Sequence, residues 1–182
     1  MASVASKLLE LHERLSQAAI EHAFGGAIAL AYWTENPRGT IDIDINVFVL
    51  PDAAERVLSF LPDEIAWYGG TVEEIERTGQ IRLWWERTPV DLFFSYEPLH
   101  ADAARNRRLV PFEGTKIPVL GPVELAVFKV MFDRTQDWAD IEAMLRAGHL
   151  DLDALRETLV SLVGKGDDRL ARLEDAQRRA QE

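Results

Sequence analysis

The sequence predicts a mixed α/β fold of the α+β type, in which a small mixed sheet is flanked by helices and followed by a C-terminal helical part. Three observations predict it. An amphipathic helix opens the chain, because Leu8, Leu11 and Leu15 recur at helical spacing between charged residues. Runs rich in β-branched and aromatic residues follow, up to about residue 96. From Pro98 onward the apolar residues recur mostly at helical spacing.

Local patterns give each element in turn. After the first helix, a second helix begins in "GGAIALAYW", "TENPRG" forms a loop, "TIDIDINVFVL" forms a strand, and Pro51 stands in the first turn of a short helix. Strands are then expected at 64–73, 79–86 and 89–96. Helices are expected at 98–107, 121–133, 135–147, 151–163 and from about 167, with a hairpin near 109–119. We therefore expect a sheet-containing core, residues 1–120, and a helical part, residues 121–182, packed on that core.

Composition excludes several classes of function. The chain of 182 residues has no cysteine, which excludes disulfides, thiol catalysis and thiolate zinc sites and fits a cytoplasmic protein. The charged, amphipathic N-terminus predicts neither a signal peptide nor a membrane span. A net charge of −11 argues against broad nucleic-acid binding, which needs many cationic contacts to phosphate. The one basic cluster, "RNRR" at 105–108, is either a solvated helix face or a contact to phosphate or RNA.

Two aspartates interrupt the first strand. Side chains alternate along a strand, so Asp42 and Asp44 share one face while Ile41, Ile43 and Ile45 share the other. Their Cα atoms should be roughly 6.5 Å apart, close enough for both carboxylates to meet one cation. The alternative is a half-exposed strand with a wet outer face.

A glycine pair lies upstream of these aspartates. Gly25 and Gly26 stand between the first and second helices, where glycine permits a tight turn and exposed N–H groups at a helix N-terminus attract an anion such as phosphate. The stretch from Gly26 to Asp42 is long enough for a two-turn helix and a return loop, which would bring the glycine turn beside the carboxylates. The alternative is an ordinary glycine cap at the end of the first helix.

A third aspartate, Asp91, stands in the strand-forming run "RTPVDLFFS". A buried carboxylate needs a partner, because desolvating it unpaired costs several kcal/mol. A metal shared with Asp42 and Asp44 is one such partner. A structural salt bridge to Arg82 or Arg87 on the preceding strand is the other.

Together these pieces resemble the nucleotidyltransferases of the DNA polymerase β superfamily. The resemblance rests on Gly-Gly, on "RGTIDID", on "PVDLFF" and on "KVMFDRTQDWADIEAML", and it covers roughly residues 20–147. The last of these stretches is similar to the Lys-to-Arg/Lys-x-x-Asp helix pair of small bacterial members, including the toxin-type enzymes of abortive-infection and toxin–antitoxin systems. The chain departs from many members in having Gly-Gly in place of Gly-Ser, which removes a serine hydroxyl from the phosphate site.

The resemblance implies a polymerase β-like fold and a Mg²⁺-dependent transfer of a nucleoside monophosphate from an NTP to an acceptor hydroxyl. Asp42 and Asp44 would hold Mg²⁺ against the triphosphate, and Asp91 would complete a two-ion site near the acceptor and help deprotonate it. The nucleotide-binding residues would be Gly25, Gly26, Arg38, Thr40, Lys129 and Asp137.

Several of these residues have plainer interpretations. Arg38 is equally well a solvated loop arginine, and Lys129 can snorkel or pair with Asp133. Asp137 and Asp140 are by default a solvated helix face. Tryptophans 67, 84 and 85 suit core or hairpin packing, although an aromatic side chain beside Asp91 could stack on a nucleobase.

Two functions from different classes remain open. One is the nucleotidyltransferase, and the other is a non-catalytic nucleotide-binding or partner-binding module of the same fold. Within the first, the acceptor could be RNA, a protein or a small molecule. The acidic charge favours a cationic small molecule, which an acidic cleft attracts.

Overall fold

The computed structural model describes residues 2–34, 39–95 and 98–182, and the chain divides into two compact units. Met1–Ile28 and Gly39–Leu120 form the first, called here the sheet unit. Ala29–Arg38 and Gly121–Glu182 form the second, the helical unit. The first residues of α2 (Gly26–Trp33) therefore belong to the sheet unit and the rest to the helical unit.

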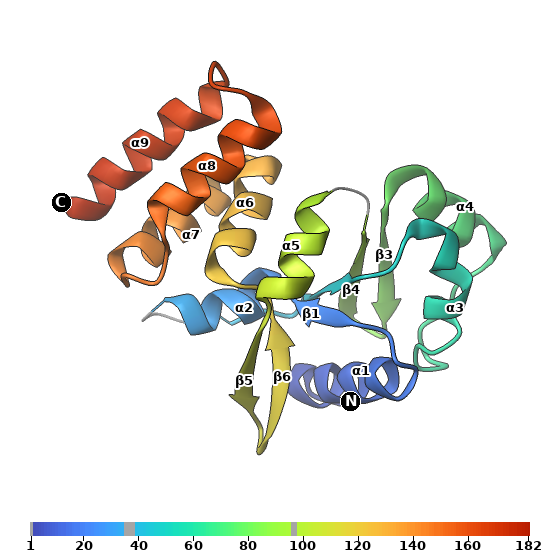
Figure 1. The fold of residues 1–182 in the computed structure, drawn as a ribbon. Coiled ribbons are helices and arrows are strands. Elements are labelled where there is room, and N and C mark those ends of the chain that lie inside the picture. The colour runs from blue at the N-terminus through green and yellow to red at the C-terminus, as the bar shows by residue number, and fades with distance from the viewer. Residues whose placement is uncertain (1, 35–38, 96–97) are drawn as a thin grey trace. The chain divides into compact units, whose positions relative to one another are not determined.

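The sheet unit is built on a six-stranded mixed sheet with strand order β3-β4-β2-β1-β6-β5 (Figure 1). The strands are β1 (His22–Phe24), β2 (Ile43–Val47), β3 (Gln80–Trp85), β4 (Thr88–Phe94), β5 (Arg108–Phe112) and β6 (Thr115–Val119). Strands β2 and β4 run parallel, as do β1 and β6, whereas the other neighbours are antiparallel. This arrangement confirms the predicted mixed sheet.

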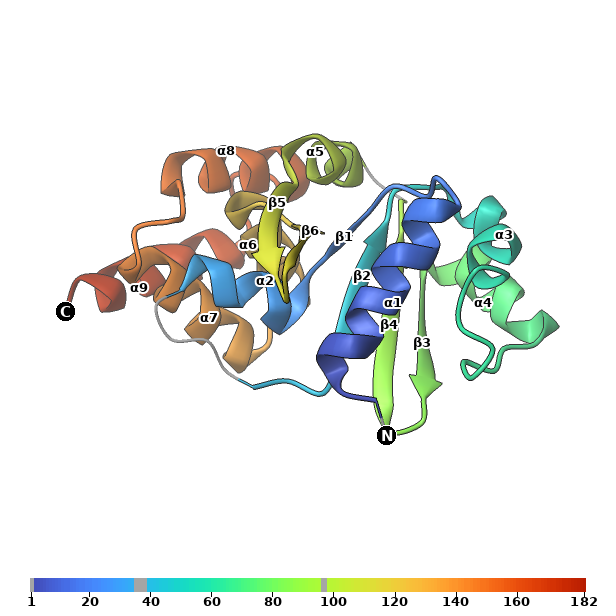
Figure 2. The ribbon, with the colours of Figure 1, turned by 90° about the horizontal axis from the view of Figure 1, so that it is seen from below.

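One face of the sheet forms the core of this unit. The first helix, α1 (Val4–Gln17), begins at Ser3, whose side chain accepts a hydrogen bond from the Ser6 N–H, and it lies across strands β2 and β4 (Figure 2). Its apolar stripe is fully buried, as are the alternate residues of both strands: Leu8, Leu11, Leu15, Ile43, Ile45, Val47, Val90 and Leu92. Burying each such side chain contributes about 1.5–3 kcal/mol. The intervening residues of β2 and β4 therefore point to the opposite face.

The sequence-based prediction of a strand at 64–73 is wrong. Within 64–73, only Ile65 forms a β-bridge, to Trp85. Residues from Gly69 onward form the helix α4 (Gly69–Thr78), which lies beside β3 (Figure 1). In the chain, α4 follows η1 (Pro51–Ala53) and α3 (Ala54–Leu58). Thr71 and Ile75 are buried one helical turn apart, so the helix period prevails over their β propensity. Gly69 and Gly70 begin this helix.

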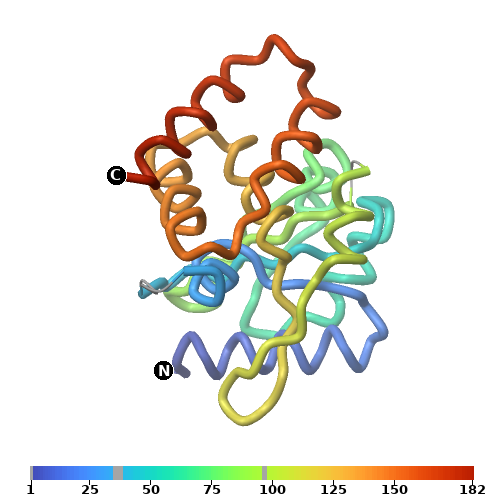
Figure 3. The backbone as a smooth tube through the Cα atoms, turned by 60° about the vertical axis from the view of Figure 1, so that its left-hand side comes forward, coloured from blue at the N-terminus to red at the C-terminus, as the bar shows by residue number. Residues whose placement is uncertain are grey.

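The remaining elements of the sheet unit match expectation except for β1, which the sequence did not predict. Helix α5 (Pro98–Asn106) confirms the helix expected at 98–107, and strands β5 and β6 confirm the hairpin (Figure 3). Its turn contains Glu113 and Gly114, both in the left-handed region, with φ of 44° and 84°.

The helical unit contains α6 (Pro122–Phe132), α7 (Thr135–Arg146), α8 (Leu152–Val163) and α9 (Asp168–Gln181), all near their predicted positions. Pro122 opens α6, and the side chains of Asp151 and Asp167 cap α8 and α9. Helix α9 packs against α7, where Arg179 bonds Glu142 at 2.6 Å. The residues of "VGKGDDR" connect α8 to α9.

None of the helices in the part of the chain that the structure describes is both long enough and apolar enough to cross a membrane.

Candidate active site

Three charged residues form a row across neighbouring strands of the sheet. Asp44 of β2 stands directly opposite Asp91 of β4, and Asp91 stands directly opposite Arg82 of β3. Directly opposed residues share a face, so this row lies on the face that α1 does not cover. Asp42, two residues before Asp44 and just outside β2, points the same way. We call Asp42, Asp44 and Asp91 the acidic row.

Arg82 grips Asp91 with its guanidinium. Its Nε donates to Oδ1 at 2.7 Å and its NH2 group donates to Oδ2 at 2.6 Å, which is the bidentate geometry that makes arginine–carboxylate pairs strong. The same NH2 group lies 3.8 Å from Oδ2 of Asp42. The hydrogen bonds that Arg82 donates to Asp91 raise the pKa of Arg82, and the negative charges of Asp42 and Asp44 raise it further. The salt-bridge alternative for Asp91 is therefore present in the structure.

Gly26 brings the backbone against Asp44. Its φ is +50°, and a Cβ built on it would lie 1.8 Å from Oδ2 of Asp44. The glycine turn therefore does lie beside a carboxylate, as the spacing predicted. However, the pair does not cap the first helix. Helix α1 ends at Gln17, and Ala19, with φ of 53°, takes the left-handed position there, so Gly25 and Gly26 instead follow β1 and open α2.

Gly25 has a different role from the one expected. Its N–H donates to the carbonyl of Asp44 at 2.9 Å, which extends the pairing of β1 with β2. This N–H is therefore committed within the sheet and is not available to a phosphate in this arrangement. A Cβ on Gly25 would lie 3.1 Å from Nδ2 of Asn46, so a side chain here would crowd the Asn46 amide. Gly25 fixes the glycine turn against β2.

Thr40 shapes the approach to β2. Its hydroxyl accepts a hydrogen bond from the Asp42 N–H at 3.1 Å and donates to the Asp42 carbonyl at 3.3 Å. These bonds hold the bend from which the Asp42 side chain projects. The other loop residue expected to bind nucleotide, Arg38, lies outside the described residues.

Lys129 and Asp137 belong to the helical unit, where they form a buried ionic cluster. Lys129 donates to Asp140 at 2.6 Å and lies 3.5 Å from Asp137, and all three side chains are buried. Arg134 adds two bonds to Asp137. Burial alone would raise the pKa of Asp137, but the bonds from Arg134 and the charge of Lys129 lower it overall.

This cluster corrects two expectations. Asp137 and Asp140 do not form a solvated face, since they are only 2% and 4% exposed. Lys129 does not pair with Asp133, which instead accepts a hydrogen bond from the Trp138 indole at 2.7 Å and pairs with Arg172. Helix α6 ends at Phe132, so the chain turns before Asp133 can stand one helical turn from Lys129.

The aromatic residues divide between the two faces of β3. Trp85 is buried, whereas Trp84 is 55% exposed and shares its face with Arg82. The basic cluster of residues 105–108 is largely engaged within the sheet unit: Arg105 pairs with Asp102 and Arg107 with Glu21, while Arg108 donates to the carbonyl of Asn106. These partners support the plainer interpretation of that cluster.

From the sequence, Arg82 is predicted only as an alternative partner of Asp91 and not as a site residue. The register of the hairpin formed by β3 and β4 brings Arg82 to the site. Trp85 pairs with Thr88 across a turn at Glu86 and Arg87, and this register places Arg82 opposite Asp91.

The donor set of the acidic row suits a hard cation, because carboxylate oxygens are the ligands that Mg²⁺ prefers. The Asp44 carboxylate occupies the place next to Gly26 that the Cβ of any other residue would need. No group of three or more acidic or histidine side chains among the described residues is arranged to hold a metal ion.

Comparison with solved structures identifies the fold. The chain is similar to an antigenic nucleotidyltransferase-like protein from Paracoccidioides brasiliensis, with a TM-score of 0.52 and 18% identity over 94% of this chain and 92% of that one. It is also similar to a candidate nucleotidyltransferase from H. pylori, with a TM-score of 0.50 and 17% identity over 98% of this chain and 92% of that one. No protein-family model and no curated protein sequence matches the chain.

These likenesses confirm the nucleotidyltransferase fold that the sequence motifs predicted.

Proposed function

We propose that this protein is a Mg²⁺-dependent nucleotidyltransferase that moves a nucleoside monophosphate from an NTP to an acceptor hydroxyl. The observation that carries the proposal is the pairing of Asp44 with Asp91 on adjacent parallel strands, with the Gly26 turn against Asp44 and Asp42 two residues away. Carboxylates aimed together from a rigid sheet meet the main demand of this chemistry, which is to position and neutralise a triphosphate.

The residues divide between two tasks. Asp42 and Asp44 would hold Mg²⁺ on the nucleotide side, and Asp91 would hold it on the acceptor side. The bound ions would supply positive charge to the phosphate oxygens. Asp91 accepts the proton of the acceptor hydroxyl while the hydroxyl oxygen forms its bond to the α-phosphorus. The bond from the α-phosphorus to the bridging oxygen breaks, and pyrophosphate leaves with that electron pair.

Further contacts to the nucleotide follow from the glycine turn. The turn at Gly26 and the first residues of α2 can receive a phosphate, because the N-terminus of a helix favours negative charge. Gly25 supports that turn through its bond to Asp44, and Thr40 supports Asp42. Arg38, Lys129 and Asp137 remain proposed nucleotide contacts. For Lys129 and Asp137, contact requires that the buried pair with Asp140 be shared or exchanged.

The acceptor we favour is a cationic small molecule carrying a hydroxyl group. The net charge of −11 raises the local concentration of cations near the protein, whereas an RNA acceptor would be repelled. Within the basic cluster of residues 105–108, Arg105 is already paired with Asp102 and Arg107 with Glu21.

A second candidate is a non-catalytic nucleotide-binding or partner-binding module of the same fold. The observation that favours it is the bidentate grip of Arg82 on Asp91, which supplies a complete partner for this carboxylate without any ion. The two candidates differ in one measurable respect, since only the enzyme releases pyrophosphate.

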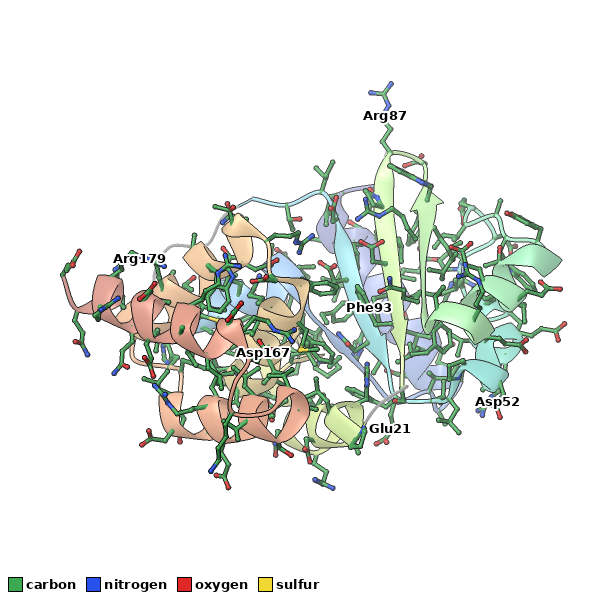
Figure 4. The ribbon with its side chains drawn as sticks, turned by 90° about the horizontal axis from the view of Figure 1, so that it is seen from above. Glu21, Asp52, Arg87, Phe93, Asp167 and Arg179 are labelled. Carbon is green, nitrogen blue, oxygen red and sulfur yellow. The ribbon has the colours of Figure 1, made fainter. Side chains whose placement is uncertain are left out.

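The test is pyrophosphate release from each of the four NTPs, with Mg²⁺ and a panel of hydroxylated cationic acceptors, against the same mixtures with a chelator. Asp44→Asn and Asp91→Asn should each lower the rate by at least about 100-fold. Asp52→Asn is the matched control, because Asp52 is exposed in η1 and Figure 4 labels it at the outer side of the unit. Mg²⁺-dependent NTP binding without any release would favour the non-catalytic module.

A further inference from the structure

We propose that Arg82 is a built-in counter-ion of the acidic row, and that it must let go of Asp91 before a divalent cation can bind there. The inference rests on the proposed function in that it takes the acidic row as the metal site. It adds a residue that competes with the metal. Arg82 is in this view a positioning residue, which sets when the site can be loaded.

The Asp91 carboxylate already has a cationic partner. Both of its oxygens accept hydrogen bonds from Arg82, at 2.7 and 2.6 Å, and its side chain is only 13% exposed. A cation that uses these oxygens must share them with a guanidinium that carries the same sign of charge. Sharing is unfavourable, because two like charges would meet at one carboxylate.

The positive charge of Arg82 partly balances the negative charges of the acidic row. Asp42, Asp44 and Asp91 place three negative charges in one row, and Arg82 is bonded to one of them and 3.8 Å from another. Without a metal, the guanidinium relieves the repulsion among these carboxylates. A divalent cation would relieve it more fully, so the two cations are alternatives at one place.

The position of Arg82 also allows its side chain to move. Arg82 lies on β3, the terminal strand of the sheet, and its side chain is 52% exposed. It can therefore turn toward solvent without opening the core. Arginine remains protonated at any ordinary pH, so the exchange has to occur by movement of the side chain and not by loss of its charge.

Two consequences follow for the proposed reaction. Free Mg²⁺ binds weakly, because it must displace the guanidinium without offering it a new partner. The phosphates of a nucleoside triphosphate offer the displaced guanidinium a new partner. Mg²⁺ therefore binds more tightly when the nucleotide is present, and the nucleotide binds more tightly when Mg²⁺ is present. The site is thereby loaded with the metal and its substrate together.

The test is a calorimetric titration of Mg²⁺ alone into wild type, Arg82→Met and Arg87→Met. Arg87 is the matched control, because it lies on the same hairpin and Figure 4 shows its side chain pointing away from the sheet. Arg82→Met should bind Mg²⁺ about tenfold or more tightly than wild type, since a charge-assisted pair no longer has to be broken. Arg87→Met should match wild type.

A second readout guards against a misfolded variant. Without metal, Arg82→Met should melt at a lower temperature than wild type, because Asp91 has lost its partner. Added Mg²⁺ should raise its melting temperature by more than it raises that of wild type. Arg82→Lys, which keeps the charge, should bind Mg²⁺ more weakly than Arg82→Met.

The outcomes separate this inference from the proposed function. Equal or weaker Mg²⁺ binding by Arg82→Met overturns the inference even where wild type releases pyrophosphate from an NTP. Tighter binding by Arg82→Met supports the inference even where no NTP and acceptor give pyrophosphate. Failure of every variant to bind Mg²⁺ overturns the inference, while pyrophosphate release decides the reaction separately.

Discussion

The Asp44 carboxylate lies against the backbone of Gly26, where a Cβ on residue 26 would come within 1.8 Å of Oδ2 and 2.6 Å of Cγ. The residue also has a φ of +50°, which only glycine adopts at little cost. The glycine turn and the carboxylate therefore depend on each other, since neither can keep its place if residue 26 gains a side chain.

Gly26→Ala should lower the free energy of unfolding by about 1–3 kcal/mol, because it adds left-handed strain and a clash with a strand residue. It should also abolish Mg²⁺-dependent NTP binding, since Asp44 has to move. Chemical denaturation and calorimetry measure the two effects. Gly69→Ala is the control, because an added Cβ there meets nothing within 4 Å, and it should change stability by less than about 0.5 kcal/mol. Wild-type stability of Gly26→Ala would contradict the geometry described.

The buried cluster of the helical unit predicts a large stability effect at Lys129. Lys129→Met leaves Asp137 and Asp140 without their shared cation, and breaking a buried pair by removing one partner costs about 3–5 kcal/mol. Urea denaturation measures the loss. Lys165→Met, at an exposed position in the turn after α8, should have no measurable effect.

A nucleotide role for Lys129 makes a further demand that denaturation can test. A triphosphate that pairs with Lys129 must compensate for the ion pairs with this lysine that Asp137 and Asp140 lose. NTP should therefore stabilise wild type against urea by more than it stabilises Asp140→Asn, in which Lys129 is already partly released. Equal stabilisation of the two proteins would leave Lys129 with a structural role only.

His22 predicts the response of the sheet unit to acid. Burial lowers its pKa to about 4 from the ordinary 6.5, although the Ile20 carbonyl opposes this and His12 and Arg107 add to it. Between pH 6.5 and 4 the unfolded chain binds a proton that the folded chain rejects. The stability present above pH 6.5 is therefore lost as the pH falls through this window, by about 3 kcal/mol.

Denaturation curves at pH 7, 5.5 and 4.5 would show this loss. His22→Asn should flatten the pH dependence, whereas His149→Asn, at an exposed position, should keep the wild-type slope. If the stability of His22→Asn depends on pH as steeply as that of wild type, the pH dependence belongs to His12. The rings of His12 and His22 share a hydrogen bond of 2.9 Å, and burial also lowers the pKa of His12.

The sequence predicts the acidic face well because strand alternation is a strong rule. Once 42–47 are taken as extended, Asp42 and Asp44 have to share a face, and the structure puts Asp91 beside Asp44 on the next strand. Side-chain partners are harder to predict. Whether Asp91 meets a metal, Arg82 or Arg87 depends on the register of one hairpin, which propensities do not fix.

The errors have the same origin. Gly25 was expected to donate to phosphate, but the three-residue strand β1 uses its N–H, and so short a strand leaves no periodicity to detect. The second half of the strand predicted at 64–73 instead begins helix α4, because the burial of Thr71 and Ile75 on one helix face prevails over the β propensity of Thr71 and Val72. Both errors concern contacts between segments that are far apart in the sequence.

Trp84 gives the last prediction, which concerns substrate binding and not stability. Its indole is 55% exposed on the same face of β3 as Arg82, and it stands directly opposite Pro89 on the strand that carries Asp91. An aromatic ring exposed beside carboxylates of a nucleotide site can stack on a base, which contributes about 1–3 kcal/mol per base. Trp84→Ala should therefore weaken NTP binding by about tenfold or more and leave the urea midpoint unchanged, whereas Trp84→Phe should keep most of the affinity. Unaltered calorimetric affinity of Trp84→Ala for every NTP, together with a raised KM for the acceptor, would assign the ring to the acceptor instead.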